Sequence, residues 1–282
     1  FSQIHTATPG PIGLAALAVA KILKLPISGT YHTSIPQYAQ ILTGDSVIED
    51  LAWKYVLWYY GQLDVIYAPS QSTADELIER GIKPEKIRVY PRGIDVDQYH
   101  PSKRNGVLKK WFSIEGGTNL IYVGRVSKEK NMHLLADAFK QLSKEQPNTR
   151  LVVVGDGPYL HAMQQTMEGY PCYFTGYVKG EKLSELYASA DAFVFPSTTD
   201  TFGNVVLEAQ ASGIPVIVTD SGGPCENMIH KQTGLVVPAD DTRALLESMR
   251  TLVNDMAQTR TMGEAARHYA EKRSFEAAFL QT

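Results

Sequence analysis

The sequence is poor in cysteine and has no long apolar run. Its two cysteines, Cys172 and Cys225, lack the spacing of a metal site and cannot build a disulfide framework, so we expect packing residues in a reducing, cytoplasmic compartment. The longest apolar candidate, GLAALAVAKILKLP, is interrupted by Lys21 and Lys24. It falls short of the roughly 18 to 20 residues that cross a bilayer, so the sequence predicts no membrane-spanning segment.

The sequence also lacks an excess of either charge. It has 27 Lys and Arg against 30 Asp and Glu, a net charge of −3, which gives no case for a nucleic-acid partner. The 282 residues are 44% hydrophobic, enough apolar material for the cores of two domains. The chain begins FSQIH, without an initiator methionine or a signal peptide, and we expect a fragment or a processed chain.

Short β-branched runs alternate with helical stretches twice along the chain. LPISGTYHT, DVIYAPS and KIRVYPRG alternate with helices in the first part, and NLIYVGR, RLVVVGDG, CYFTGYV, DAFVFPS and PVIVTD do so in the second. This rhythm is typical of doubly wound parallel sheets covered on both faces. We predict an α/β protein with a partial Rossmann-like domain at 1–99, a polar linker at 100–117 and a second Rossmann-like domain at 118–282.

Ligands of such sheets bind beyond the carboxyl ends of the strands, so the residues after each strand are the first candidates for a site. Arg125, Ser127, Lys128 and Lys130 follow LIYVG. Cations beside a helix N-terminus suit a diphosphate, although a solvated loop is an equal alternative. Gly155 and Gly157 follow LVVVG but lack the third glycine of a dinucleotide fingerprint, which favours a tight turn.

The stretch STTDTFGNVVLEAQASGIPVIVTDSGG, residues 197–223, combines several signals. Gly203 and Asn204 fall at a predicted helix N-terminus, whose free N–H groups can bind phosphate oxygens. Asp200 and Glu208 could accept hydrogen bonds from sugar hydroxyls on either side of a diphosphate. The alternative is that Asp200 or Thr201 caps the helix and Glu208 faces water.

In the first domain, TYHTS places His32 at a strand end, and QIHTATPGP gives His5 a similar position. An imidazole there could donate to a sugar or phosphate oxygen, but a structural role is the commoner one for a single histidine. An aromatic helix, WKYVLWYYG, is predicted to be a core helix with an aromatic face; its aromatic residues also admit peripheral membrane contact.

Together, VGRVSKEKN, VVVGDGP, DAFVFPSTTDTFGNVVLEAQASGIPVIVTDSGG and TGLVVPADD resemble the retaining glycosyltransferases of family 4, which have the GT-B fold of two Rossmann-like domains facing a cleft. YHTSIPQYA and VYPRGIDVDQYHP look most like the glycolipid branch with mannosyl- and sulfoquinovosyl-transferring members. A complete relative starts with further βα units and a glycine-rich loop beside the acceptor, so the resemblance implies an N-terminally incomplete first domain.

The resemblance implies roles for individual residues. Arg125 and Lys130 match the cations that neutralise the donor diphosphate, Asp200 the acid on the donor sugar, and Glu208 the acid on the ribose. The remaining donor-binding positions, near base, sugar and phosphate, would be Gly124, Gly155, Gly157, Tyr177, Val178, Phe202, Gly203, Asn204 and Val205. Asp200 stands where the family usually has Glu, and Ala7 where many relatives have a second histidine, which leaves His32 as the catalytic candidate of the first domain.

The resemblance therefore implies retaining hexose transfer from a UDP- or GDP-sugar to a lipid or glycan acceptor. It implies no cofactor and no metal, with the leaving diphosphate stabilised by cations and a helix N-terminus. Two alternatives stay open: a GT-B sugar-nucleotide epimerase or phosphorylase, and a non-catalytic nucleotide-sugar-binding fragment.

Overall fold

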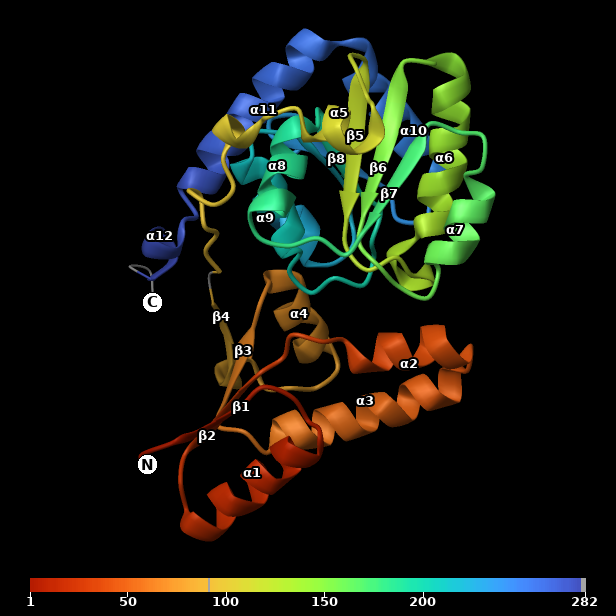
Figure 1. Cartoon of the computed structure of the whole chain (residues 1–282). Coiled ribbons are helices and arrows are strands. Elements are labelled where there is room, and N and C mark those ends of the chain that lie inside the picture. The colour runs from red at the N-terminus through yellow and green to blue at the C-terminus, as the bar shows by residue number, and fades with distance from the viewer. Residues whose placement is uncertain (91, 280–282) are drawn as a thin grey trace. The chain divides into compact units, whose positions relative to one another are not determined.

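The computed structural model describes residues 1–90 and 92–279 and divides into two compact units. Of the described residues, those up to 92 and the short segment 199–202 form the first unit, and residues 93–198 and 203–279 form the second. Each unit is built on its own parallel sheet, with helices in the connections (Figure 1). The predicted α/β class with two parallel sheets is confirmed.

The first unit is a four-stranded sheet of order β1-β2-β3-β4, in which each neighbouring pair is parallel. Its strands are β1 Ile4–Thr6, β2 Ile27–Thr30, β3 Val65–Ala68 and β4 Ile87–Val89. Its helices are α1 Pro11–Leu23, α2 Ile35–Thr43, α3 Ser46–Gly61, α4 Gln71–Glu79 and the short 3₁₀ helix η1 Pro84–Lys86. The Ser70 hydroxyl accepts the Thr73 N–H at 3.2 Å and caps α4.

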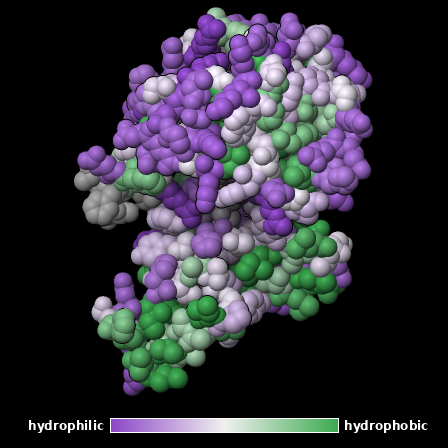
Figure 2. Space-filling view, viewed as in Figure 1, coloured by the Kyte–Doolittle hydropathy of each residue, from purple (hydrophilic) through white to green (hydrophobic). Residues whose placement is uncertain are grey.

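The aromatic helix α3 has two kinds of surface. Trp53, Tyr59 and Tyr60 are buried in the core of the first unit, whereas Tyr55 and Trp58 are exposed. Apolar residues on α1, α2 and α3 are also exposed, and Figure 2 shows hydrophobic residues gathered over these helices. They are Ile12, Leu14, Val19, Ile22, Leu23, Ile41, Leu42, Val47, Ile48 and Leu51.

The second unit is a six-stranded parallel sheet of order β10-β9-β8-β5-β6-β7. Its strands are β5 Thr118–Val123, β6 Thr149–Val154, β7 Cys172–Gly176, β8 Ala192–Phe195, β9 Val216–Thr219 and β10 Gly234–Val237. The chain runs outward from β5 through β6 to β7 and then returns to β8, on the other side of β5. This reversal of strand order is where open α/β sheets bind ligands.

Helices cover both faces of this sheet. Figure 1 shows α6 and α10 beside one face and α8 and α9 beside the other. The helices are α5 Val107–Phe112, α6 Met132–Glu145, α7 Leu160–Thr166, α8 Glu181–Ser189, α9 Asn204–Ala211, α10 Thr242–Asn254, α11 Met256–Glu271 and α12 Phe275–Phe279, with the 3₁₀ helices η2 Pro101–Lys103, η3 Lys128–Lys130 and η4 Gly223–Asn227. Strands β5, β6, β8 and β9 are almost entirely buried, which explains their continuous apolar sequences.

The segment predicted as a linker, residues 100–117, differs from that prediction in the structure. It belongs to the second unit and contains η2 and α5, both of which pack against α8. Val107 and Leu108 are buried, and Arg104 pairs with Asp191 at 3.1 Å. The linker prediction rests on the polar composition of the segment, but burial of its few apolar residues packs it onto the second unit. The division between the two units falls after residue 92.

Candidate functional site

A cavity of about 530 Å³ lies in the second unit, where the loops after β5, β6 and β7 meet helices α8 and α9. The strands contribute three consecutive residues each, and the helices contribute Leu183, Val205 and Glu208. The residues from the strand ends are Val123, Gly124, Arg125, Val154, Gly155, Asp156, Tyr177, Val178 and Lys179. The cavity therefore lies at the carboxyl edge of the sheet, where the sequence predicts a site.

Glycines allow the loops of this edge to approach one another closely. Gly155 has φ +143°, and a Cβ there would lie 1.8 Å from the carbonyl oxygen of Gly124. Gly157 has φ +158°, and its Cβ would lie 2.3 Å from the carbonyl oxygen of Val126. Any side chain would push the loops after β5 and β6 apart. The glycine pair thus shapes the cavity edge, although only Gly155 is part of its lining.

Glu208 carries a carboxylate into this cavity from α9. The Tyr187 hydroxyl donates to its Oε2 at 3.0 Å, and Tyr99 is also hydrogen-bonded to it. Burial raises the pKa of the Glu208 carboxyl, and the hydrogen bonds from Tyr187 and Tyr99 lower it in part. Burial likewise raises the pKa of both tyrosines, so both hydroxyls stay protonated donors. The alternative that Glu208 simply faces water does not describe this environment.

Arg125 is one of two cations in the described cavity lining, with Lys179. Its side chain is 58% exposed, and Nη1 lies 3.9 Å from Oε1 of Glu129, a long contact that holds it weakly. Lys130, the second predicted cation, is different: it is buried at the end of η3 and is not among the lining residues that the structure describes. The structure therefore separates the two predicted cations by environment.

Helix α9 begins at the predicted place. Gly203 caps it with φ +78°, and a Cβ there would lie 2.9 Å from Cγ of Pro224 in η4. Glycine is thus favoured both by the backbone conformation and by the close approach of η4. Asn204 is exposed in the first turn, and Val205, one residue later, lines the cavity.

Seven of the predicted residues come together around the cavity: Gly124, Arg125, Gly155, Tyr177, Val178, Val205 and Glu208. The described lining does not include Lys130, Gly157, Gly203 or Asn204. Asp200 and Phe202 belong to the segment grouped with the first unit. His32 also belongs to that unit, where its Nδ1 lies 3.1 Å from Oγ1 of Thr33. Their roles stay predictions. His5 lies 2.9 Å from Oγ of Ser28 and 3.1 Å from Oγ1 of Thr30, which fits the structural alternative.

Sequence reasoning did not single out Tyr99 or Tyr187. Tyr187 lies in EKLSELYASA, where its position is that of an ordinary buried helix residue, and Tyr99 lies at the end of the predicted first domain. No motif identifies either of them. Their common partner appears only in the folded structure, where the two rings pack edge-to-face with centroids 5.8 Å apart and both side chains interact with Glu208.

Within residues 1–90 and 92–279, no group of three or more His, Cys, Asp or Glu is arranged to hold a metal ion. In the same residues, no helix combines the length and the apolar character of a membrane span. The expectation of a metal-independent protein stays a prediction.

The cavity has chemically distinct parts. Val123, Val154, Val178 and Leu183 supply apolar surface, Glu208 supplies acceptors for hydroxyl donors, and Arg125 supplies a positive charge. A ligand with a flat, weakly polar group, a pair of hydroxyls and a negative charge complements this arrangement.

Comparisons with known proteins agree with these features. The family model described as "Glycosyl transferases group 1" matches residues 107–269, and the model described as "Glycosyltransferase Family 4" matches residues 1–98. A sulfoquinovosyl transferase of Arabidopsis thaliana is 32% identical over 98% of this chain and 54% of its own length. A GDP-mannose-dependent alpha-mannosyltransferase of Mycobacterium tuberculosis is 35% identical over 84% of this chain and 60% of its own. The chain thus spans a little over half the length of these relatives.

Solved structures show the same fold. The crystal structure of Anabaena HepE in complex with UDP and glucose matches with a TM-score of 0.85 and 22% identity, over 100% of this chain and 76% of that one. A sucrose-phosphate synthase from Thermosynechococcus elongatus matches with a TM-score of 0.82 and 23% identity, over 100% and 72%. The fold class and the family resemblance predicted from the motifs are confirmed.

Proposed function

Because this chain belongs to the group 1 glycosyl transferases, we propose that it binds a nucleoside diphosphate sugar and transfers its hexose to an acceptor hydroxyl. The observation that carries the proposal is the cavity at the carboxyl edge of the second sheet, with Glu208 in its wall and Arg125 in its lining. The relatives named above are a sulfoquinovosyl transferase and a GDP-mannose-dependent enzyme. Since the solved structure of HepE contains UDP, a UDP- or GDP-sugar is the proposed donor.

The proposed placement of the donor follows the chemistry of the lining. The base lies on the apolar surface of Val178 and its neighbours, the ribose hydroxyls donate to Glu208, and the diphosphate lies toward Arg125. The N-terminus of α9 offers backbone N–H groups for the same diphosphate. Asp200, on the loop before α9, is the proposed contact for the sugar hydroxyls.

In the proposed reaction, the bond between the anomeric carbon and the diphosphate oxygen breaks while the acceptor hydroxyl attacks from the same face and passes its proton to that departing oxygen. The configuration at the anomeric carbon is thereby retained. Arg125, Lys130 and the amides near Gly203 stabilise the negative charge on the departing diphosphate. His32 is the proposed catalytic group of the first unit, and no metal has a role in this scheme.

A lipid is the proposed acceptor, with a glycan as the alternative. The relatives include an alpha-monoglucosyldiacylglycerol synthase of Streptococcus pneumoniae, 33% identical over 76% of this chain. The exposed apolar residues of α1, α2 and α3, together with Tyr55 and Trp58, offer a surface for peripheral contact with a lipid bilayer. The proposed location is the cytoplasm, with part of the protein at the membrane.

Product analysis tests the proposed function. The protein is incubated with UDP-glucose or GDP-mannose carrying a labelled sugar, with diacylglycerol lipid in vesicles or with a soluble glycan, and with no acceptor as the control. We expect labelled lipid in the organic extract, the same anomeric configuration in donor and product, and protein that sediments with the vesicles. An epimerised donor, or no labelled product with any acceptor, would contradict the proposal of transfer.

A further inference from the structure

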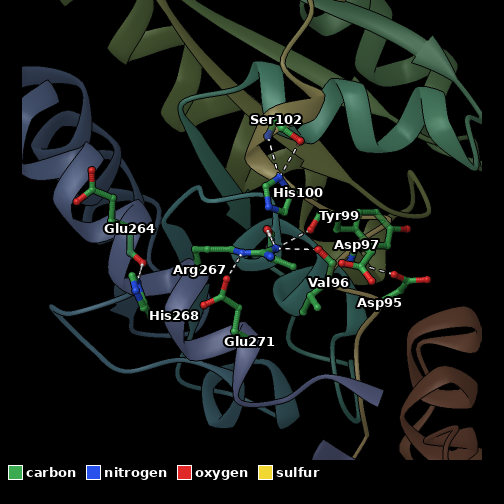
Figure 3. A network of polar contacts seen from close by, with 11 residues as sticks. Asp95, Val96, Asp97, Tyr99, His100, Ser102, Glu264, Arg267, His268 and Glu271 are labelled. Atoms are coloured by element: carbon green, nitrogen blue, oxygen red, sulfur yellow. Dashed lines mark hydrogen bonds and ion pairs between the residues drawn. The ribbon is translucent and has the colours of Figure 1, made fainter. Parts of the chain in front are cut away.

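Arg267 of α11 holds together two segments that lie far from it in sequence. Its Nη1 donates to the carbonyl oxygens of Val96 at 2.9 Å, Tyr99 at 2.9 Å and Ala211 at 2.6 Å. Figure 3 shows the guanidinium pointing toward Val96 and Tyr99. The side chain is only 13% exposed, and Nε donates to Glu271 at 2.8 Å. A buried, charged donor with three backbone acceptors is a rigid connection.

The three acceptor carbonyls belong to two segments beside the cavity, helix α9 and the loop 95–99. Ala211 is the last residue of α9, so its carbonyl is one of those that a helix leaves without an internal partner. Val96 and Tyr99 belong to the loop 95–99, which is fixed by Asp95: its Oδ1 accepts the N–H groups of Asp97 at 3.1 Å and Gln98 at 2.8 Å. Arg267 therefore sets the position of this loop relative to α9.

Glu208 lies on α9, three residues before Ala211. Its carboxylate interacts with the side chain of Tyr99, which belongs to the loop 95–99. Tyr99 is buried, stacks edge-to-face on Tyr187, and is hydrogen-bonded to the Glu208 carboxylate, which also accepts from Tyr187 at 3.0 Å. A carboxylate has about four acceptor positions. The Tyr187 hydroxyl fills one of these, the Tyr99 hydroxyl interacts with the same carboxylate, and positions are left for a ligand in the cavity that Glu208 lines.

We propose that Arg267 and Tyr99, with Tyr187, are positioning residues that orient the Glu208 carboxylate toward the two hydroxyls of the ligand's ribose. This inference rests on the proposed function, because it assumes that a nucleotide occupies the cavity. Arg267 acts on the ligand only through Tyr99 and α9. Neither tyrosine is among the described lining residues, so the effect of each on the ligand passes through Glu208.

The arrangement also affects the charge of Glu208. Burial raises the pKa of the Glu208 carboxyl and favours the neutral form, whereas the two tyrosine hydroxyls oppose this by donating to the ionised form. Asp95 adds negative charge near Tyr99, and the cavity that Glu208 lines also holds Arg125, Lys179 and Asp156. Removing one hydroxyl raises the pKa of the Glu208 carboxyl further. On acidification, Glu208 is then protonated at a higher pH than in wild type, and binding that needs its carboxylate is lost there.

The test is calorimetric binding of UDP and GDP to the wild-type protein, Tyr99→Phe and Arg267→Lys at several pH values. Phenylalanine keeps the ring and removes only the hydroxyl. We expect Tyr99→Phe to weaken binding about three- to tenfold, the effect of one hydrogen bond, and to move the acidic loss of affinity to higher pH. Arg267→Lys keeps the charge but not the fork of donors, and it should weaken binding in the same direction.

Two comparisons separate positioning from a general structural effect. UDP and GDP lacking both ribose hydroxyls should bind Tyr99→Phe and the wild type alike. Tyr269→Phe removes another buried hydroxyl of the second unit, which donates to the Glu226 carbonyl at 3.1 Å, and should leave binding unchanged. Equal affinity of Tyr99→Phe and wild type for the intact nucleotides, or equal losses with the dideoxy forms, overturns the inference. A wild-type protein that binds neither nucleotide overturns the proposed function itself.

Discussion

Gly155→Ala is expected to lower the free energy of unfolding of the second unit by about 3 kcal/mol and to abolish nucleotide binding. The added Cβ would lie 1.8 Å from the Gly124 carbonyl oxygen, which belongs to backbone that cannot rotate away. The φ of +143° is a region that only glycine adopts readily. Both loops line the cavity, so relief of the clash must change its shape.

Thermal or urea unfolding measures the stability change, and Gly169→Ala is the matched control. Gly169 has φ +79° in the same unit, but a Cβ there meets nothing within 4 Å. Only the backbone strain then remains, with a cost of about 1 kcal/mol. If Gly155→Ala and Gly169→Ala have the same free energy of unfolding, the close approach of the two loops does not contribute to stability.

The double variant Arg125→Ala, Lys130→Met is expected to lose about 100- to 1000-fold in the rate of sugar transfer. Both cations are proposed to stabilise the leaving diphosphate, whose charge is greatest in the transition state. Methionine at position 130 keeps much of the volume of a buried side chain and so limits the loss of packing. The rate constant is measured at saturating donor, so that weaker binding does not enter the comparison.

Lys128→Ala provides the control for this variant. Lys128 lies in the same loop but is exposed, and its removal changes the local charge without touching either proposed group. We expect its rate to stay within about twofold of wild type, since isolated exposed charges contribute little. If the double variant transfers sugar as fast as Lys128→Ala, the leaving-group role proposed for Arg125 and Lys130 is wrong.

The sequence predicts most of the second unit because its signals are local. The apolar strands and the start of α9 at Gly203 are properties of a few neighbouring residues. The structure differs from the predicted linker at 100–117 because the packing of this segment depends on residues that are distant in sequence. Val107 and Leu108 are two apolar residues in a polar segment, and their burial depends on α8, more than 70 residues further along the chain.

The candidate site also has a part that is predictable from local sequence and a part that is not. Gly124, Arg125, Gly155 and Val178 follow strands, so their meeting at one edge is a consequence of parallel topology. The environment of Glu208 is not local: Tyr99 and Tyr187 reach it from a loop and from another helix. Single tyrosines carry no pattern, and only tertiary packing identifies them as its partners.

We propose that the cavity of the second unit binds the nucleoside diphosphate through Glu208. Calorimetric titration of the wild-type protein and of Glu208→Gln with UDP and GDP is the test. Glutamine keeps the shape and removes the charge, and Glu264→Gln, an exposed position on α11, is the control. Hydrogen bonds to a charged group predict a loss of about 10- to 100-fold at pH 7.

The pH dependence sharpens this measurement. Burial raises the pKa of the Glu208 carboxyl, so the carboxylate is lost, and wild-type affinity falls, at a higher pH than for an exposed glutamate. Glu208→Gln should lack this acidic step. We expect saturable binding of one of the two nucleotides to wild type, weakened in Glu208→Gln and unchanged in Glu264→Gln. Absence of binding of either nucleotide, or equal binding by wild type and Glu208→Gln, would contradict a nucleotide site at Glu208.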